Sequence, residues 1–343
     1  MEKKKNSSMK TRIITGSLIF LVTAIIIALT EITEMPYFFT LFILFVNIFA
    51  VKELIKVYNS QNKKCSNAYV YLSYLYIFVV YQIYFIVELL KRSSTNIPVK
   101  SILVFQLVAF FVFFMLAFVF DLLFLAKQRK KVEKATSVKD ETQNEIYPKI
   151  DENIEEVRDV NASELLLTTK RTLSLMIYPT TLLATFYGIA NILTINVAFI
   201  ILIFGVTYFT DVFAYFVGTL FHKGEFAPQI SPKKSVSGAI GGILGGIIFS
   251  LIAYILLYHY NIFRIEFLIS MTPLRMKLFF GFVGLFGSLL VEFGDLVAST
   301  IKRQNGVKDF GNMFPGHGGM MDRVDGLMFC SAFTYVLVLL LFA

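Results

Sequence analysis

The sequence of 343 residues contains no tryptophan, only two cysteines and few charged residues. Cys65 and Cys330 lie far apart, and their spacing matches neither a disulfide framework nor a metal-ligand motif. Charged residues make up 16% of the chain and hydrophobic residues 56%, whereas a soluble globular chain carries about 25% charged residues. This balance excludes an ordinary soluble protein and predicts a polytopic membrane protein. The lack of tryptophan does not separate a cell membrane from an organelle membrane, and we expect the former.

The hydrophobic residues are gathered in nine segments, each close to the roughly 20 residues that cross a bilayer as a helix. We therefore predict an all-α polytopic membrane protein with about nine transmembrane helices. The first segment is longer than the apolar region of a secretory signal and many more follow it, so we expect no cleaved signal peptide. The predicted spans are 12–30, 37–51, 68–90, 101–126, 172–193, 196–217, 236–258, 278–298 and 325–343.

Lysine and arginine are distributed unevenly among the connecting segments. Of the 32 basic residues, 26 lie in segments that share one side of the membrane if the N-terminus is cytoplasmic. This asymmetry predicts a cytoplasmic N-terminus and, after nine spans, a C-terminus on the opposite side. It also accounts for the net charge of +8 without a nucleic-acid partner. The predicted cytoplasmic segments are 1–12, 52–67, 127–171, 222–235 and 299–324.

A long charged segment divides the chain. Residues 127–171 carry ten basic and ten acidic residues and are predicted to form a solvated cytoplasmic loop. Residues 1–126 then form an N-terminal membrane half of four spans, with a predicted role as a scaffold or dimerisation surface. Residues 172–343 form a C-terminal half of five spans, which carries nearly all the unusual polar residues and is predicted to be catalytic.

Ionisable side chains within spans are expensive and usually functional. Asp211 lies near the cytoplasmic end of one predicted span. Near the cytoplasmic end of another, Glu292, Asp295, Ser299 and Lys302 are spaced so that they share one face if the helix continues. We therefore expect several carboxylates to meet at one depth, near the cytoplasmic interface.

The segment that follows, "KDFGNMFPGHGGMMDRVD" from Lys308 to Asp325, adds further acids, bases and glycines. Oxygen-rich clusters suit a hard cation such as Mg²⁺, which binds through one or two carboxylates plus substrate phosphates. Basic side chains and glycine amides suit phosphate groups. Ion pairing and helix capping are the alternative explanation for one or two of the acids. Together these residues point to nucleotide or phosphoryl chemistry on a lipid.

A second cytoplasmic segment, "APQISPKKSVSG", supplies Ser231, Lys233 and Lys234. These residues are candidates for holding a lipid phosphate or a nucleotide, and interfacial snorkelling of the two lysines is the alternative. The next span contains Gly238, Gly242 and Gly246 at intervals of four. Such a ridge of small residues favours close helix packing.

The stretch "STIKRQNGVKDFGNMFPGHGGMMDRVD" resembles the signature of the phosphatidate cytidylyltransferases, also called CDP-diacylglycerol synthases. Seventeen positions between Ser299 and Asp325 fit that signature, and the resemblance extends over residues 196–343. The chain departs from the family pattern at Val236 and Ser237, where an aromatic residue and a glutamate are usual. It departs again at His222, where glycine is frequent.

The resemblance implies that CTP and phosphatidic acid react to give CDP-diacylglycerol and pyrophosphate at the cytoplasmic face, as a step of phospholipid biosynthesis. It implies Mg²⁺ as cofactor, with room for a second cation. Asp295 and Asp322 carry over as metal ligands, with Asp309 and Asp325 completing or orienting the set. Asp295, Lys302 and Asp322 are the predicted catalytic residues. The candidates for phosphate or CTP contacts are Lys302, Arg303, Lys308, His317, Gly318, Gly319 and Arg323.

Two other functions remain open at this level. A CTP-dependent polyprenol or lipid kinase would also use CTP and a lipid, but it would transfer the γ-phosphoryl group and release CDP instead of pyrophosphate. An ion-coupled transporter would place its acids near the bilayer midplane, whereas Asp211 and Asp295 lie near the cytoplasmic ends of their spans. The expected partners are CTP, phosphatidic acid and the bilayer, with a homodimer as a candidate assembly.

Overall fold

The computed structural model describes residues 14–19, 21–29, 37–59, 67–92, short stretches between 108 and 127, 169–171, 197–228, 230–259 and 272–342. The chain divides into two compact units. The first comprises residues 1–57 together with 179–343, and the second comprises residues 58–178. The predicted loop 127–171 and the predicted span 172–193 lie almost entirely outside the described residues, and the predicted span 101–126 does so in part.

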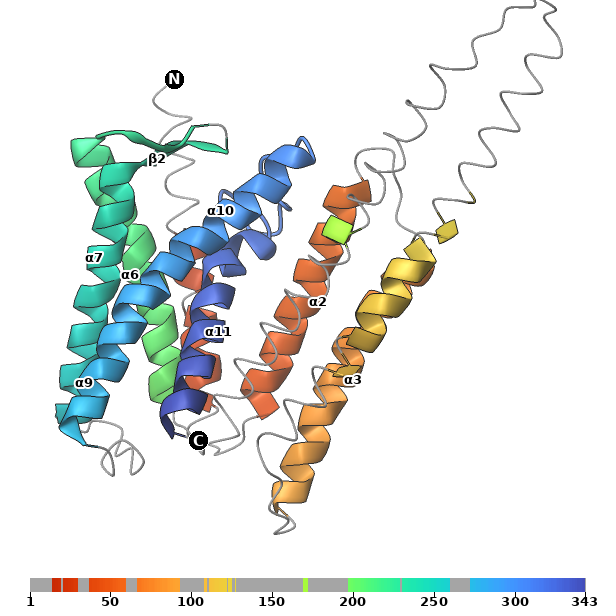
Figure 1. The fold of residues 1–343 in the computed structure, drawn as a ribbon, viewed down its shortest axis with the longest axis horizontal. Helices are drawn as coiled ribbons and strands as arrows, with labels where there is room; N and C mark the ends of the chain where they lie inside the picture. The colour runs from red at the N-terminus through yellow and green to blue at the C-terminus, as the bar shows by residue number, and fades with distance from the viewer. Residues whose placement is uncertain are drawn as a thin grey trace, which may run out of the picture. The chain divides into compact units, whose positions relative to one another are not determined.

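The first unit is a helical bundle with one small hairpin (Figure 1). Its N-terminal part holds an apolar helix at Ile14–Leu29 and helix α2, Tyr37–Asn59. Its C-terminal part carries α6 (Val197–Phe221), β1 (Glu225–Ala227), β2 (Ser231–Ser235), α7 (Val236–Ala253), η2 (Tyr254–His259), α9 (Pro273–Phe282), η3 (Val283–Gly287), α10 (Ser288–Gln304) and α11 (Met321–Phe342).

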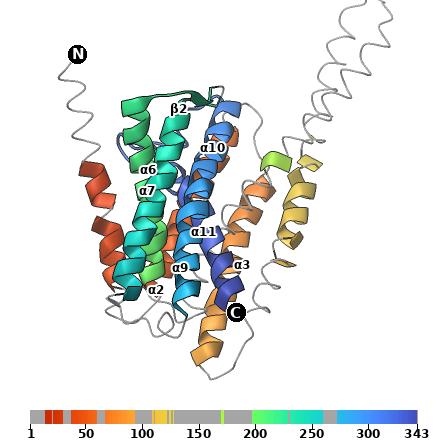
Figure 2. The same cartoon turned by 60° about the vertical axis from the view of Figure 1, so that its left-hand side comes forward.

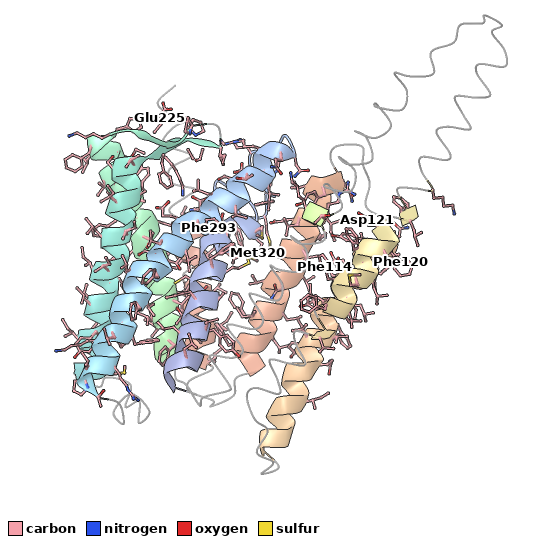
Figure 3. All side chains as sticks on the ribbon, viewed as in Figure 1. Phe114, Phe120, Asp121, Glu225, Phe293 and Met320 are labelled. Atoms are coloured by element: carbon pink, nitrogen blue, oxygen red, sulfur yellow. The ribbon has the colours of Figure 1, made fainter. Side chains whose placement is uncertain are left out.

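The second unit contains α3, Asn67–Arg92, and a short apolar helix, Phe111–Asp121. Phe114, Phe120 and Asp121 lie on that short helix (Figure 3). Arg171 Nη1 lies 3.6 Å from Oδ2 of Asp121, and both side chains are almost completely buried. The unit therefore contains a buried ion pair between Asp121, in the predicted span 101–126, and Arg171, the last residue of the predicted charged loop.

Helices α6 and α7 pack closely because α7 presents glycine to its neighbour. A Cβ atom at Gly238 would lie 2.9 Å from the carbonyl oxygen of Ala214, and one at Gly242 would lie 3.0 Å from that of Thr210. A Cβ at Gly246 would lie 2.7 Å from the Cβ of Ser288. A side chain at any of the three positions would force neighbouring atoms to shift, so the predicted packing role of the glycine ridge is confirmed.

The other face of α7 is apolar and exposed. Ile240, Leu244, Ile248 and Leu251 lie on it at helical spacing, each with more than 40% of its surface accessible. Exposing this apolar stripe to water would cost free energy, whereas in a bilayer the stripe faces lipid. Within the described residues, three helices are long and apolar enough to cross a membrane: Phe199–Phe221, Val236–Leu256 and Pro273–Gln304. A largely helical integral membrane protein was therefore predicted correctly.

The last of these spans is one continuous rod made of α9, η3 and α10. Thr272 caps its start by accepting a bond from the N–H of Arg275, and Pro273 occupies the first turn. A single π-helical stretch, η3, interrupts it at Val283–Gly287. The helix then continues past Lys302 to Gln304, as the shared face of Glu292, Asp295 and Lys302 requires.

The short hairpin β1–β2 was not anticipated from the sequence. It pairs Glu225 with Ser235 and Ala227 with Ser231, antiparallel. Figures 1 and 2 both show it at the end of the bundle where α6 stops, α7 starts and α10 ends. Ser235 closes the hairpin and caps α7, because its hydroxyl accepts the N–H of Gly238 at 3.1 Å. Lys234, which precedes Ser235 on β2, is thereby placed at that end of the bundle.

Candidate functional site

The segment between α10 and α11 is a tightly turned loop. The N–H of Phe314 donates to the carbonyl of Gly318 at 2.9 Å, and the N–H of His317 donates to the carbonyl of Phe314 at 2.9 Å. Gly316 and Gly318 have φ angles of 79° and 83°. Since side chains rarely tolerate this left-handed region, the "PGHGG" motif has a conformational requirement for glycine at both positions.

Asp322 organises this loop from the first turn of α11. Its Oδ1 atom accepts a bond from Lys302 Nζ at 2.8 Å. Its Oδ2 atom accepts the backbone N–H groups of Phe310 and Gly319, each at 2.9 Å. The side chain of Lys302 also lies over the ring of Phe310, with Nζ 5.2 Å from its centroid. One carboxylate thus fixes α10, the middle of the loop and the loop's end.

A second carboxylate, Glu53 on α2, supports the loop from the opposite end of the sequence. It accepts the N–H of Met320 at 3.0 Å and that of Met321 at 2.9 Å, and Figure 3 shows Met320 where the loop enters α11. A Cβ atom on Gly311 or Gly319 would collide with the Glu53 carboxylate. These two glycines are therefore required by the close approach of Glu53.

Glu53 was missed in the sequence because its neighbourhood carries no recognisable signal. It stands between Lys52 and Lys56, and such a mixture of charges at the end of an apolar segment is typical of a solvated helix end. Only the fold brings it to residues more than 260 positions away. The contact makes the N-terminal part of the chain a structural component of the site.

Lys234 bridges two acids of α10. Its Nζ atom lies 2.6 Å from Oε2 of Glu292 and 2.7 Å from Oδ2 of Asp295. Burial lowers the pKa of Lys234, but the carboxylates of Asp295 and Glu292 outweigh that effect and raise the pKa above the ordinary lysine value. Lys234 is therefore cationic at neutral pH and joins strand β2 to the acidic face of α10.

Two further acids belong to the same electrostatic group. Asp211 on α6 interacts with Asp295 and Glu292, and Asp325 on α11 interacts with both Asp295 and Asp211. The acids that the sequence placed on three separate spans are thus brought together. Lys234, Lys302 and Arg323 offset part of their charge.

A polar cavity of about 640 Å³ opens on the loop. Its lining combines cationic side chains with the exposed backbone of the glycine turn, which is the composition that suits phosphate groups. Five of the predicted phosphate or metal residues lie there. The lining consists of Lys308, Asp309, Asn312, Phe314, Pro315, Gly316, His317, Gly318 and Arg323.

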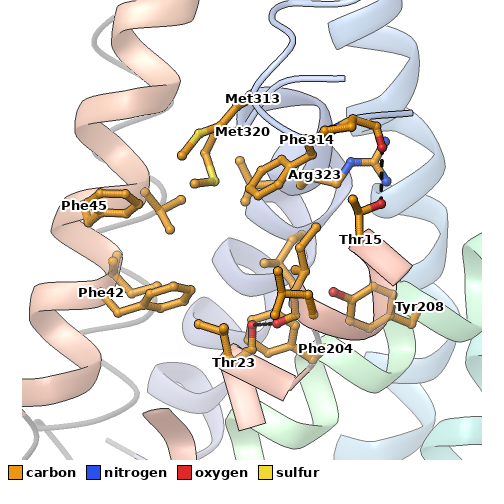
Figure 4. Close-up of a pocket in the computed structure, with 18 residues that line it drawn as sticks. Thr15, Thr23, Phe42, Phe45, Phe204, Tyr208, Met313, Phe314, Met320 and Arg323 are labelled. Atoms are coloured by element: carbon orange, nitrogen blue, oxygen red, sulfur yellow. Dashed lines mark hydrogen bonds between the residues drawn. The ribbon is translucent and has the colours of Figure 1, made fainter. Parts of the chain in front are cut away.

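An apolar cavity of about 370 Å³ adjoins it (Figure 4). Its walls come from the helix Ile14–Leu29, from α2, from α6 and from the start of α11. Phe314, Pro315 and Arg323 line both cavities. A molecule with a phosphate head and a hydrocarbon tail could therefore occupy both at once, with Arg323 at the junction.

Some predicted residues have other partners in this structure. Arg303 donates through Nε to the carbonyl oxygen of Ile230 at 3.2 Å, which ties α10 to the hairpin. Gly319 lies against Glu53, and its N–H donates to Asp322. Ser231 belongs to the hairpin register, and the side chain of Lys233 lies outside the described residues.

The acids fit Mg²⁺ by the chemistry of their donors, although no three acidic, histidine or cysteine side chains converge to metal-binding distance within the described residues. A nucleotide-bound Mg²⁺ needs only one or two carboxylates, because phosphates and water complete its shell. Asp295 uses Oδ2 for Lys234, and a carboxylate has about four acceptor positions. Asp322 uses three of its positions, which leaves one for a metal.

Comparison with known proteins agrees with this site. The sequence model of the cytidylyltransferase family matches residues 10–341. A phosphatidate cytidylyltransferase of Thermotoga maritima is 32% identical over 186 residues, which cover 52% of this chain and 63% of that protein. A protein of the same name from Bacillus subtilis is 37% identical, over 38% of this chain and 44% of that protein. Another from Aquifex aeolicus is also 37% identical, over 48% of this chain and 55% of that protein.

The chain therefore aligns with less than two thirds of the length of each of these relatives. The match of the family model, in contrast, runs through nearly the whole chain and includes the N-terminal helix, α2 and α11. The resemblance predicted from the signature is confirmed. The chain belongs to the cytidylyltransferase family.

Proposed function

We propose that the protein is a phosphatidate cytidylyltransferase, which converts CTP and phosphatidic acid into CDP-diacylglycerol and pyrophosphate. The observation that carries this proposal is the pair of adjoining cavities, one polar and one apolar, that share Arg323, Phe314 and Pro315. A lipid phosphate at this junction would keep its chains in an apolar environment while its head meets the polar cavity. The names of the relatives support the same substrates.

The reaction requires two polyanions to approach each other. An oxygen of the lipid phosphate forms a bond to the α-phosphorus of CTP, and the bond from that phosphorus to the oxygen bridging to the β-phosphate breaks. Pyrophosphate leaves with the bonding electrons. The phosphate monoester has a second pKa of about 6, so it is already largely ionised at neutral pH and no separate general base is needed.

The residues of the site have distinct tasks in this scheme. Lys308, His317 and Arg323 line the polar cavity and would neutralise phosphate charge. Gly318 contributes backbone to the same lining. Lys302 would contribute indirectly, because its hydrogen bond to Asp322 holds that carboxylate in place.

Asp295 and Asp322 are the proposed metal ligands, with Asp309 and Asp325 completing or orienting the set. Mg²⁺ bound there would neutralise the triphosphate and orient its α-phosphorus. Lys234 holds Asp295 from the hairpin side, and Asp211 stays a candidate as an additional acid beside them. Ser231 and Lys233 stay candidates for contact with the lipid phosphate or the nucleotide.

We further propose that this site faces the cytoplasm of a cell membrane, in a protein with nine spans and its C-terminus on the opposite side. The excess of lysine and arginine in the segments that flank the site supports this orientation. The proposal also keeps the division of the chain into three parts: a scaffold half, 1–126, a charged loop, 127–171, and a catalytic half, 172–343. It includes a homodimer built on the first of these parts.

The reaction is tested with purified full-length protein, phosphatidic acid in mixed micelles, Mg²⁺ and CTP labelled at either the α- or the γ-phosphorus. We expect the α-label to enter the lipid phase as CDP-diacylglycerol and the γ-label to leave as pyrophosphate. A γ-label that enters the lipid while CDP is released would identify a CTP-dependent kinase instead. The matched control is Asp295→Asn, which should insert normally and form no product.

A further inference from the structure

His317 is held from its Nδ1 side by a residue at the other end of the chain. The hydroxyl oxygen of Thr15 lies 2.7 Å from Nδ1 of His317 and 3.3 Å from the carbonyl oxygen of Pro315. The His317 ring also packs on Gly16, where an added Cβ atom would lie 3.6 Å from Cε1 and Nε2. Two residues of the N-terminal helix therefore define where the ring lies.

The two contacts of Thr15 are compatible in one arrangement. Its hydroxyl carries a single proton, and the Pro315 carbonyl can only accept. Both contacts are hydrogen bonds at once when Thr15 donates to Pro315 and His317 donates from Nδ1 to Thr15. The ring is then fixed in position and its Nδ1 proton is committed to Thr15, so Nε2 is the nitrogen that meets a substrate in the cavity. Nε2 donates to a phosphate oxygen when the ring carries both protons.

The position of Thr15 is as informative as its bonds. Thr15 lines the apolar cavity (Figure 4), while His317 lines the polar one. Their hydrogen bond therefore joins the two linings at the junction that Arg323 also occupies. A change of the N-terminal helix on one side would be transmitted directly to the histidine on the other.

We propose that Thr15 is a positioning residue that orients the His317 ring toward a substrate phosphate. This inference rests on the proposed cytidylyltransferase activity and adds to it a residue outside the family signature. The phosphate belongs either to CTP or to the lipid. Separate KM values for the two substrates distinguish these sources, because only the substrate that His317 touches should bind more weakly.

The test compares Thr15→Val, which keeps the shape but removes the hydroxyl, with Thr15→Ser, which keeps the hydroxyl. We expect Thr15→Val to lower kcat/KM for one substrate on the order of tenfold, the size of one hydrogen bond, and Thr15→Ser to restore it. In a His317→Ala background, Thr15→Val should have no further effect. A full effect in that background, or wild-type kinetics for Thr15→Val, would overturn the inference.

A second readout does not depend on turnover. Diethyl pyrocarbonate acylates accessible imidazole nitrogens, and peptide mass spectrometry follows each histidine separately. We expect Thr15→Val to speed the modification of His317 and to leave that of the exposed His222 unchanged. An unchanged rate at His317 contradicts the inference even when the enzyme is active. If the wild-type protein forms no CDP-lipid, the proposed function fails, and the inference fails with it whatever the modification rates.

Discussion

The ammonium group of Lys302 lies 2.8 Å from Oδ1 of Asp322, and both side chains are largely buried. The pair links the last turn of α10 to the first turn of α11. The other oxygen of Asp322 holds two backbone amides of the loop between these helices. Asp322 is thus both a proposed metal ligand and the residue that shapes the polar cavity.

Replacing Asp322 with asparagine should therefore remove activity and lower stability together. The amide nitrogen of asparagine must face either the Lys302 ammonium or the two N–H groups, so a donor meets a donor. Breaking a buried ion pair on one side costs about 3–5 kcal/mol. We expect no measurable CDP-lipid formation and a clear fall in the unfolding temperature in detergent.

The matched control is Asp309→Asn. Asp309 lies exposed on the polar cavity, so its replacement should leave the unfolding temperature unchanged. If Asp322→Asn unfolds at the wild-type temperature and retains full activity, neither the supporting role nor the metal assignment holds.

The Lys234 cluster gives a prediction about pH. The pKa of Lys234 is raised in the folded protein, so its ion pairs with Glu292 and Asp295 stabilise the protein fully below the ordinary lysine pKa of about 10.4. That stabilisation is lost only as the pH rises through the higher, folded value. The difference in unfolding temperature between wild type and Lys234→Met should stay constant from neutral pH to about pH 9 and shrink above about pH 10.4. A difference that disappears nearer neutrality would mean that Lys234 is not held by these acids.

Sequence and structure agree best where the signal is local. The spacing of Glu292, Asp295 and Lys302 predicted one continuous helix face, and α10 provides it. The glycine ridge of α7 predicted close packing, and the distances to α6 require it. Both predictions depend only on helical periodicity, which a sequence displays directly.

The supports of the site could not be predicted, because they depend on contacts between distant segments. Glu53 and Thr15 lie in the part of the chain that the sequence assigned to a scaffold, yet they hold Met321 and His317. Neither carries a motif, and each becomes recognisable only when the helices are assembled. The hairpin was missed for another reason, since "SPKKS" has none of the alternation that predicts a strand.

The contact between Glu53 and the loop glycines makes Gly319→Ala a sensitive test. An added methyl group would collide with the Glu53 carboxylate and push it from the amides of Met320 and Met321. We expect a loss of several kcal/mol in stability, in the range of about 1–3 kcal/mol for each unsatisfied buried group, and a large loss of activity.

Gly281→Ala is the control for that experiment. Gly281 lies in helix α9, and a Cβ there meets no atom within 4 Å. The substitution should be neutral or stabilise the helix by about 0.5–1 kcal/mol. Equal behaviour of the two alanine variants would show that Glu53 does not press on the loop.

The apolar cavity predicts a separation of lipid binding from nucleotide binding. Ile43 on α2 is buried and lines this cavity but not the polar one. Tryptophan at this position would fill space that a hydrocarbon chain needs, so the KM for long-chain phosphatidic acid should rise while the KM for CTP stays unchanged. The KM for a soluble analogue with short chains should rise much less, because that analogue depends less on the cavity.

The control is Leu244→Trp on the exposed face of α7, which should leave both KM values unchanged. A rise in both KM values for Ile43→Trp would indicate a distorted site, and no rise for long-chain substrate would place the lipid chains elsewhere.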